Sequence, residues 1–211
     1  MASILQKAMR RAWRRTVNDF SSCAMSDPAE EPALSRTPHI ALYSQCGFGN
    51  FGNDATFEVV LKHLRRHLPH ARITGVVRHA RPVTRQFRVP AVEFYPAARF
   101  RPHNEIAPAK LVRQGANELV RIGQAARFLS GVDYLIMAGG GRFDDFNSCA
   151  TEQPYWLWKW TTLARLFGAP VELLSIGAGP VDFRLSRLFY RHVASLVTRR
   201  SFRDEESRRS F

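Results

Sequence analysis

Apolar runs and amphipathic stretches alternate along the chain from residue 38 onward. Short, mostly apolar runs, which are typical of strands, occupy residues 39–44, 72–77, 91–95, 132–138 and 171–176, and we expect a last strand at 198–202. Apolar residues at helical spacing fill the intervals, at 54–68, 109–129, 154–167 and 185–196, and one more helix starts near Asp204. Strands that alternate with helices predict an α/β domain built on a parallel sheet.

The runs at 132–138 and 171–176 are apolar at nearly every position, which indicates strands covered by helices on both faces. Loops rich in glycine or charge follow the predicted strands, at 45–54, 139–145 and 177–180. Ligands of open α/β sheets bind outside the carboxyl ends of the strands. We therefore expect these loops to lie along one edge of the sheet, and we expect the functional site at that edge.

Residues 1–20 are basic, with Leu5, Met9, Trp13 and Val17 on one helical face. This pattern fits a helix on an anionic membrane surface, a transit peptide, or a helix that packs on its own domain. Residues 21–37 are small, polar and proline-containing, which predicts a linker. We expect three segments: this helix and linker over 1–37, the folded domain over 38–203, and the start of a helix over 204–211. Domains seldom end one turn into a helix, so we expect a second domain beyond residue 211.

Composition narrows the classes of function. The net charge is +13, from 31 Lys and Arg against 18 Asp and Glu. Such charge attracts phosphates, but the arginines follow no stripe and no nucleic-acid-reading motif is present, so we expect no nucleic-acid partner. Three widely spaced cysteines indicate reduced thiols in the cytoplasm. His63 and His67 have metal-ligand spacing without a third ligand, so we expect no metal.

The first candidate site is the loop between the first predicted strand and helix. Glycines permit close approach of the backbone to a ligand, and N–H groups at a helix start can hold a phosphate or carboxylate. The alternative is a strand–helix turn with Asp54 as the helix N-cap. An NAD site would need an acid after the second strand, where Arg78 and His79 stand. The candidate residues are Gly47, Gly49, Asn50, Asn53 and Asp54.

The other candidates follow later strands. Arg142 and Arg203 can pair with a carboxylate or phosphate. Asp144 and Asp145 can orient a sugar hydroxyl or act as a base, or they can cap a turn or pair with Arg142. Arg203 can instead bridge to Asp54 or Asp144 as a structural contact. The full set is Gly139, Gly140, Gly141, Arg142, Asp144 and Asp145, then Gly177 and Gly179, then Arg203 and Asp204.

Aromatic residues crowd the helix predicted at 154–167. Tyr155, Trp156, Trp158 and Trp160 lie within six residues of one another. They form a platform on which a sugar stacks, or else part of the core or of a domain interface.

Four strings, taken in order, resemble one family, the polysaccharide pyruvyl transferases. They are Gly47–Asp54 (G-x-G-N-x-G-N-D), Gly139–Asp145 (G-G-G-x-x-D-D), Gly177–Pro180 (G-x-G-P) and Arg203–Ser207 (R-D-x-x-S). The resemblance runs from about residue 40 to residue 210. Phe143 stands where the family often has leucine, and Asn53-Asp54 stands where Gly-Asp is common; neither change touches a charged group.

The resemblance implies a Rossmann-like domain, the N-terminal half of a fold with two such domains facing across a cleft, like the GT-B glycosyltransferases. It implies transfer of pyruvate from phosphoenolpyruvate to two hydroxyls of a sugar or lipid-linked glycan, with no redox cofactor. In the family, the general-acid histidine lies in the C-terminal half. We therefore expect this chain to bind substrate without turning over alone, and its catalytic residues are unknown. We expect a cytoplasmic location, peripheral at the inner membrane face.

Three other interpretations remain. One is a glycosyltransferase of the same architecture that uses a sugar nucleotide. Another is a non-catalytic remnant or interaction module, suggested by the position at which the chain stops. The third, a nucleic-acid binder, is motivated only by charge.

Overall fold

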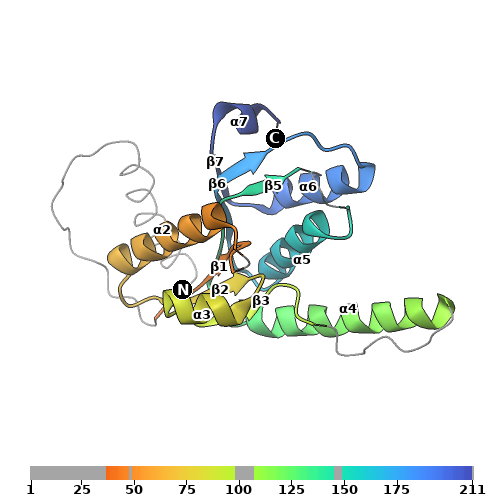
Figure 1. Cartoon of the computed structure of the whole chain (residues 1–211), viewed down its shortest axis with the longest axis horizontal. Coiled ribbons are helices and arrows are strands. Elements are labelled where there is room, and N and C mark those ends of the chain that lie inside the picture. Colours follow the sequence, from red (N-terminus) through yellow and green to blue (C-terminus); the bar gives the residue numbers. More distant parts are fainter. Residues whose placement is uncertain (1–36, 48, 98–106, 145–148, 211) are drawn as a thin grey trace.

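The computed structural model describes residues 37–210 except for residue 48 and residues 98–106 and 145–148 (Figure 1). The helix and linker predicted within residues 1–37 therefore lie almost wholly outside the described residues. In chain order the elements are β1 (His39–Tyr43), α2 (Phe51–His67), β2 (Arg72–Val77), α3 (Ala80–Phe87), β3 (Ala91–Glu93), α4 (Ala107–Leu129), β4 (Tyr134–Ala138), β5 (Gly141–Phe143), α5 (Gln153–Leu166), β6 (Val171–Ala178), α6 (Arg184–Leu196), β7 (Arg199–Phe202) and α7 (Glu205–Ser210).

Within the described part of the chain, seven strands form one sheet in which every pair is parallel. The strands follow the order β3-β2-β1-β4-β6, and β7 pairs with the far side of β6. The short strand β5 continues the line of β4, because Gly139 and Gly140 both bond to β6. The predicted α/β fold with a parallel, Rossmann-like sheet is confirmed.

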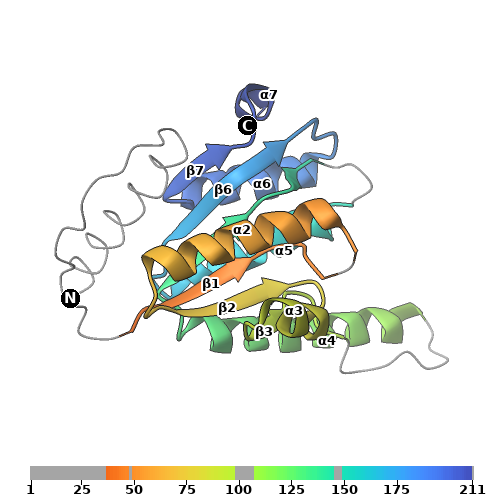
Figure 2. The same ribbon diagram turned by 60° about the vertical axis from the view of Figure 1, so that its left-hand side comes forward.

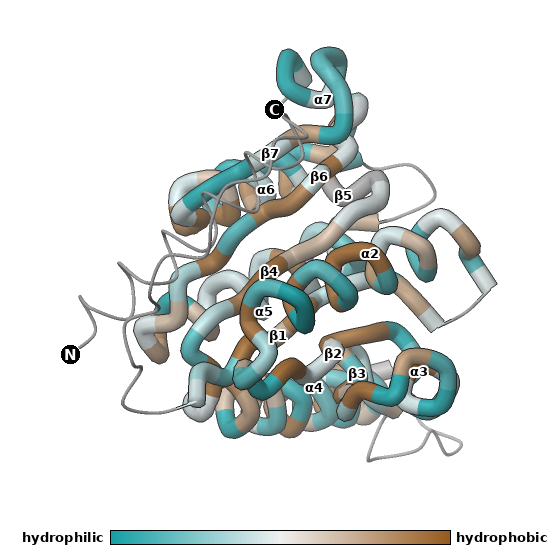
Figure 3. The backbone as a smooth tube through the Cα atoms, turned by 90° about the vertical axis from the view of Figure 1, so that its left-hand side faces the viewer, coloured by the Kyte–Doolittle hydropathy of each residue, from teal (hydrophilic) through white to brown (hydrophobic). Residues whose placement is uncertain are grey.

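Helices cover both faces of the sheet, as the apolar strands predicted. Figure 2 shows α2 and α3 in front of the sheet and α4, α5 and α6 behind it. Alternate residues of β1 serve the two layers: Ile40 and Leu42 pack under α2 and α3, while Ala41 and Tyr43 face α4 and α5. The most hydrophobic stretches run along the inner strands β4 and β6, and α7 is hydrophilic (Figure 3).

Two elements were not predicted. In α3 only Val83 and Phe87 are buried, so the helix carries a weak apolar signal and a proline in its first turn. The strand β5 is three residues long and begins with glycine, and only its pairing with β6 makes it a strand. Among the described residues, no helix has both the length and the apolar character needed to cross a membrane.

Candidate functional site

The carboxyl ends of the parallel strands define one edge of the sheet, which we call the carboxyl edge. The loops after β1, β4, β6 and β7 all leave from this edge, as predicted. Direct contacts link them. The N–H of Gly177, after β6, donates to the carbonyl of Gly140, after β4, at 2.9 Å. The N–H of Arg203, after β7, donates to the carbonyl of Ile176 at 3.0 Å.

The loop after β1 is held by its own polar groups. The N–H of Gly47 donates to Oδ1 of Asp54 at 3.0 Å, and Nδ2 of Asn53 donates to the carbonyl of Gln45 at 3.3 Å. Asn50 is the N-cap of α2, because its Oδ1 accepts the N–H of Asn53 at 3.2 Å. The alternative with Asp54 as N-cap is therefore wrong: the N-cap lies four residues earlier, and Asp54, in the first turn of α2, accepts the N–H of Gly47.

Gly47 is required by space as well as by conformation. Its φ is +94°, and a Cβ there would lie 2.8 Å from the carbonyl oxygen of His79 and 2.9 Å from Cγ2 of Val83. The loop after β1 thus presses against the start of α3. Gly49 also has a positive φ, +89°, but a Cβ on it would meet nothing within 4 Å.

Glycines after β4 let α2 approach the sheet. Gly139 has φ +62°, and a Cβ there would lie 2.3 Å from Cγ2 of Thr56 on α2. Gly140 follows with φ +80°, and Gly141 pairs with Gly177 in register. Together with the loop after β1 (residues 44–50), residues 139–141 are called the glycine loops below.

The structure describes some of the polar residues that follow β4. Arg142 is the middle residue of β5, and Asp145 lies outside the described residues. The carbonyl of Asp144 accepts the hydroxyl of Tyr190 at 2.9 Å. The N–H of Gly179 donates to the carbonyl of Phe143 at 3.0 Å, so the loop after β6 is fixed against β5.

Arg203 lies at the β7 end of the carboxyl edge. A Cβ on Gly177 would lie 3.2 Å from Cζ and Nη2 of Arg203, so glycine makes room for this guanidinium. The alternative of a structural bridge to Asp54 or Asp144 is wrong: Arg203 pairs with the next residue, Asp204, at 2.9 Å from Nε to Oδ2. The side chain of Arg203 remains 59% exposed, which keeps it accessible to a ligand.

Asp204 is the N-cap of α7, as predicted, because its Oδ1 accepts the N–H of Ser207 at 2.7 Å. Hydrogen bonds from Ser207, and then from Arg203, lower the pKa of Asp204 to about 2. The carboxylate is therefore ionised throughout the physiological range, and it orients Arg203.

Sequence reasoning missed a cationic cluster at the β2 end of the same edge. Arg78 directly follows β2, and its Cζ lies 5.0, 5.7 and 6.0 Å from the ring centroids of Trp156, Tyr95 and Phe94. We call these four residues the Arg78 cluster. The available signal was a charged residue directly after a buried strand. Two of the rings belong to the residues directly after β3 and the third belongs to α5, so no linear motif reveals them.

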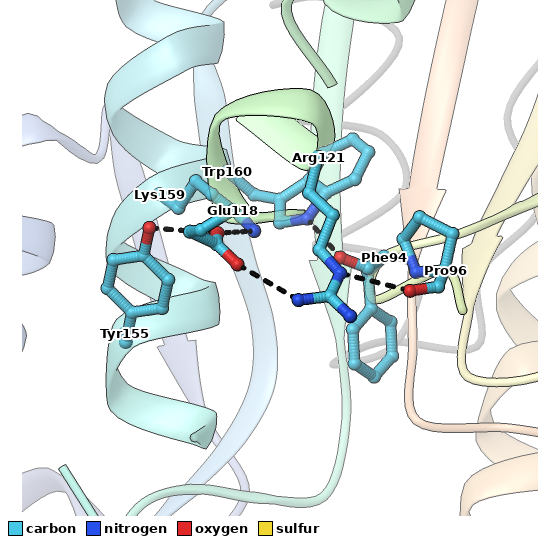
Figure 4. Close-up of polar contacts among 7 residues, drawn as sticks. All are labelled: Phe94, Pro96, Glu118, Arg121, Tyr155, Lys159 and Trp160. Atoms are coloured by element: carbon cyan, nitrogen blue, oxygen red, sulfur yellow. Dashed lines mark hydrogen bonds and ion pairs between the residues drawn. The ribbon is translucent and has the colours of Figure 1, made fainter. Parts of the chain in front are cut away.

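An ion network lies next to the Arg78 cluster and contacts it through Tyr95; Figure 4 shows the side chains of this network. Glu118 of α4 accepts hydrogen bonds from Lys159 at 2.7 Å and from the hydroxyl of Tyr155 at 2.9 Å, and it pairs with Arg121 at 3.4 Å. Arg121 also stacks on Tyr95, with its Cζ 3.9 Å from the ring centroid. These four residues, Glu118, Arg121, Tyr155 and Lys159, are the support network.

Burial sets the protonation of the support network. The side chain of Lys159 is only 2% exposed, and this desolvation lowers its pKa, while the hydrogen bond and charge of Glu118 act in the opposite direction. Burial and then the bond to Glu118 raise the pKa of Tyr155. Tyr155 therefore stays a neutral donor at physiological pH.

The aromatic residues of α5 divide between core and edge. Trp160 is buried in the core and donates its N–H to the carbonyl of Phe94 at 3.1 Å. Trp158 donates to Nδ1 of His192 at 2.8 Å, and Trp156 covers Arg78. The core interpretation therefore holds for Trp160. His63 and His67 stack at 4.3 Å, and the described part of the chain contains no group of three residues able to hold a metal.

These features define a class: an α/β protein whose parallel sheet presents glycine loops and arginines at its carboxyl edge, where such sheets bind ligands. A model of the polysaccharide pyruvyl transferase family matches residues 50–211. The chain belongs to the polysaccharide pyruvyl transferase family, as the four strings predicted. No curated protein and no solved structure matches it. The individual roles of the candidate site residues in substrate binding stay predictions.

Proposed function

We propose that the protein transfers pyruvate from phosphoenolpyruvate to two hydroxyl groups of a sugar, and so forms a ketal in an exopolysaccharide or another cell-surface glycan. The observation that carries this proposal is the family match over residues 50–211, which spans most of the first string and all of the other three. The family indicates a transferase that acts on a polysaccharide acceptor. The donor and the product are inferred from the resemblance.

The proposed chemistry begins with protonation of the methylene carbon of phosphoenolpyruvate, which creates an oxocarbenium-like centre at C2. One sugar hydroxyl attacks C2 and loses its proton. Phosphate then leaves with the C2–O bond electrons, and the second hydroxyl attacks C2, loses its proton and closes the ring. The steps need a general acid, a general base and cations that hold the phosphate and carboxylate. They need no redox cofactor.

Arg203 is the best-supported cation for the donor. Its guanidinium is exposed, lies against Gly177 and is oriented by the ionised Asp204. Arg142, in β5, is the second candidate, on the strand that pairs with Gly177 and Ala178. A guanidinium binds the two oxygens of a phosphate or carboxylate in parallel, which suits both ends of phosphoenolpyruvate.

Calorimetric titration of the 211-residue chain with phosphoenolpyruvate tests the donor. Arg203→Gln should weaken binding about tenfold, the effect of losing one charge-assisted hydrogen bond. Arg127→Gln is a matched control, because Arg127 is exposed in the last turn of α4, which leads into the opposite edge of the sheet. Equal binding in both variants would remove Arg203 from the site. Tighter binding of a sugar nucleotide than of phosphoenolpyruvate would instead support a glycosyltransferase.

The expectation that this chain binds without turnover stays a proposal with its own readout. Release of inorganic phosphate from phosphoenolpyruvate in the presence of an acceptor would contradict it. The cytoplasmic position at the inner membrane face is likewise proposed. It predicts co-sedimentation with anionic liposomes, and this should be lost when residues 1–20 are removed.

A further inference from the structure

Two hydrogen-bond donors in the Arg78 cluster are buried and have no acceptor among the described residues. They are Nη1 of Arg78 and Nε1 of Trp156. A guanidinium N–H and an indole N–H can only donate, so each needs an oxygen or another acceptor to offset the water it has lost. The guanidinium and the indole ring lie close together, with Cζ of Arg78 5.0 Å from the ring centroid of Trp156.

The cluster lies on one face of the sheet, at the carboxyl edge. Val76 packs in the core layer shared with α4 and α5, and Arg78 comes two residues later, so it leaves the strand toward the same layer. Phe94 and Trp160 belong to that layer too. The aromatic faces hold the guanidinium by cation–π contacts and exclude water from it.

The position is rigid. Arg121 stacks on Tyr95 and donates to the carbonyl of Pro96 at 3.0 Å, while Trp160 fixes the carbonyl of Phe94 (Figure 4). The segment that carries two of the rings around Arg78 is thus anchored by contacts of its own. Buried donors that lack an acceptor and are held by rigid neighbouring residues are expected in a preorganised ligand site. Such donors do not stabilise the fold, so folding stability alone gives no reason for their presence.

Arg78 and Arg203 are too far apart to share one small ligand. Arg78 follows β2 and Arg203 follows β7, with β1, β4 and β6 between them. Four strand spacings of about 4.8 Å separate the two ends, on the order of 19 Å. Phosphoenolpyruvate carries its phosphate and its carboxylate on the same carbon, so it cannot reach both arginines.

We propose that Arg78 and Trp156 form an anion subsite that binds a phosphate or carboxylate group carried by the acceptor glycan. The inference rests on the proposed function in assigning the Arg203 end to phosphoenolpyruvate and in taking a glycan as the acceptor. Binding forms charge-assisted hydrogen bonds from both the guanidinium and the indole N–H, because the acceptor is ionised.

Nuclear magnetic resonance of the ¹⁵N-labelled full chain tests the subsite. Trp156→Phe assigns the indole N–H signal of Trp156, and inorganic phosphate is the first probe. We expect a saturable shift of that signal and binding about tenfold weaker in Arg78→Met, which keeps an apolar stem against the rings. Arg72→Met is the matched control, because Arg72 begins the same strand at the opposite edge and its loss changes the net charge equally.

The outcomes separate the sources of the anion. Two results together support the proposal. A hexose phosphate should shift the Trp156 signal equally in Arg203→Gln and in the unchanged protein, and phosphoenolpyruvate should not shift it. A shift caused by phosphoenolpyruvate would place the donor at Arg78 and overturn the assignment to the acceptor. A signal that no anion shifts would overturn the subsite, even where calorimetry shows that phosphoenolpyruvate binds at Arg203. If Arg78→Met does not fold, calorimetry on Trp156→Phe should show a loss of affinity of about threefold or more.

Discussion

The glycine loops and the Arg78 cluster lie on the same edge of one sheet, but their polar groups are used differently. In the loop after β1, Asp54, Asn53 and Asn50 all accept or donate within the loop and the first turn of α2. In the Arg78 cluster, two donors are buried without an acceptor among the described residues. The comparison indicates that residues of a recognisable motif can serve to build the loop, while donors left for a ligand lie in residues outside the motif.

The largest expected effect comes from crowding in the glycine loops. Gly47→Ala should lower the free energy of unfolding by about 3 kcal/mol, because its Cβ would meet the backbone oxygen of His79, which cannot rotate away. Gly49→Ala shares the positive φ without the contact and should cost about 1 kcal/mol. Urea unfolding measures both. Equal losses would show that Gly47 serves conformation alone and that the loop does not depend on its contact with α3.

The next effect concerns the support network. Glu118→Gln removes the charge that offsets buried Lys159 and should cost about 2–3 kcal/mol at pH 7. The control is Glu58→Gln, which breaks the exposed pair with Lys62 and should change stability by less than about 0.5 kcal/mol.

The pH dependence of the Glu118→Gln loss has a definite sign. Burial lowers the pKa of Lys159, so between that lowered pKa and the unfolded value near 10.4 the unfolded chain binds more protons and stability rises with pH. Without Glu118 the pKa falls further, and the deficit of the variant should shrink as the pH rises from the pKa of Lys159 in the variant to its pKa in the unchanged protein. A deficit that stays constant would mean that lost packing, not an unpaired charge, destabilises the variant.

The parts of this molecule that sequence predicts are those encoded by neighbours in the chain. The strand at 72–77 and its parallel neighbours follow from continuous apolar runs, and Asp204 is recognisable as an N-cap from the residues after it. β5 exists only because β6 offers a free edge beside Gly177, and α3 buries just two apolar residues. Arg78 contacts the rings of Trp156, Tyr95 and Phe94 only in the folded chain, so sequence patterns could not predict this cluster.

A smaller effect on stability is expected at Arg78 itself. Arg78→Met removes a buried donor that has no acceptor among the described residues, and it keeps apolar contact with the rings. The free energy of unfolding should change by less than about 1 kcal/mol, well below the loss in Glu118→Gln. Urea unfolding beside Arg72→Met checks this. A loss of about 3 kcal/mol would make the guanidinium a structural group and erase the contrast with the glycine loops.

The smallest expected effect on stability comes from Asp204, at the β7 end of the carboxyl edge. Asp204 pairs with Arg203, just as Asp54 accepts the N–H of Gly47 in the loop after β1. The pKa of Asp204 is lowered to about 2 by Ser207 and Arg203, whereas an unfolded aspartate titrates near 3.9. A lowered carboxyl pKa contributes stability that is present above about pH 4 and is lost as pH falls through about 2. Thermal unfolding between pH 2 and pH 5 should therefore show a shallower slope in Asp204→Asn, which keeps an N-cap but removes the charge. Asp182→Asn removes one exposed carboxyl without touching α7 and serves as the control. Identical slopes in the unchanged protein and Asp204→Asn would show that Asp204 does not hold Arg203 in solution, and that the arginine proposed for the donor is not preoriented.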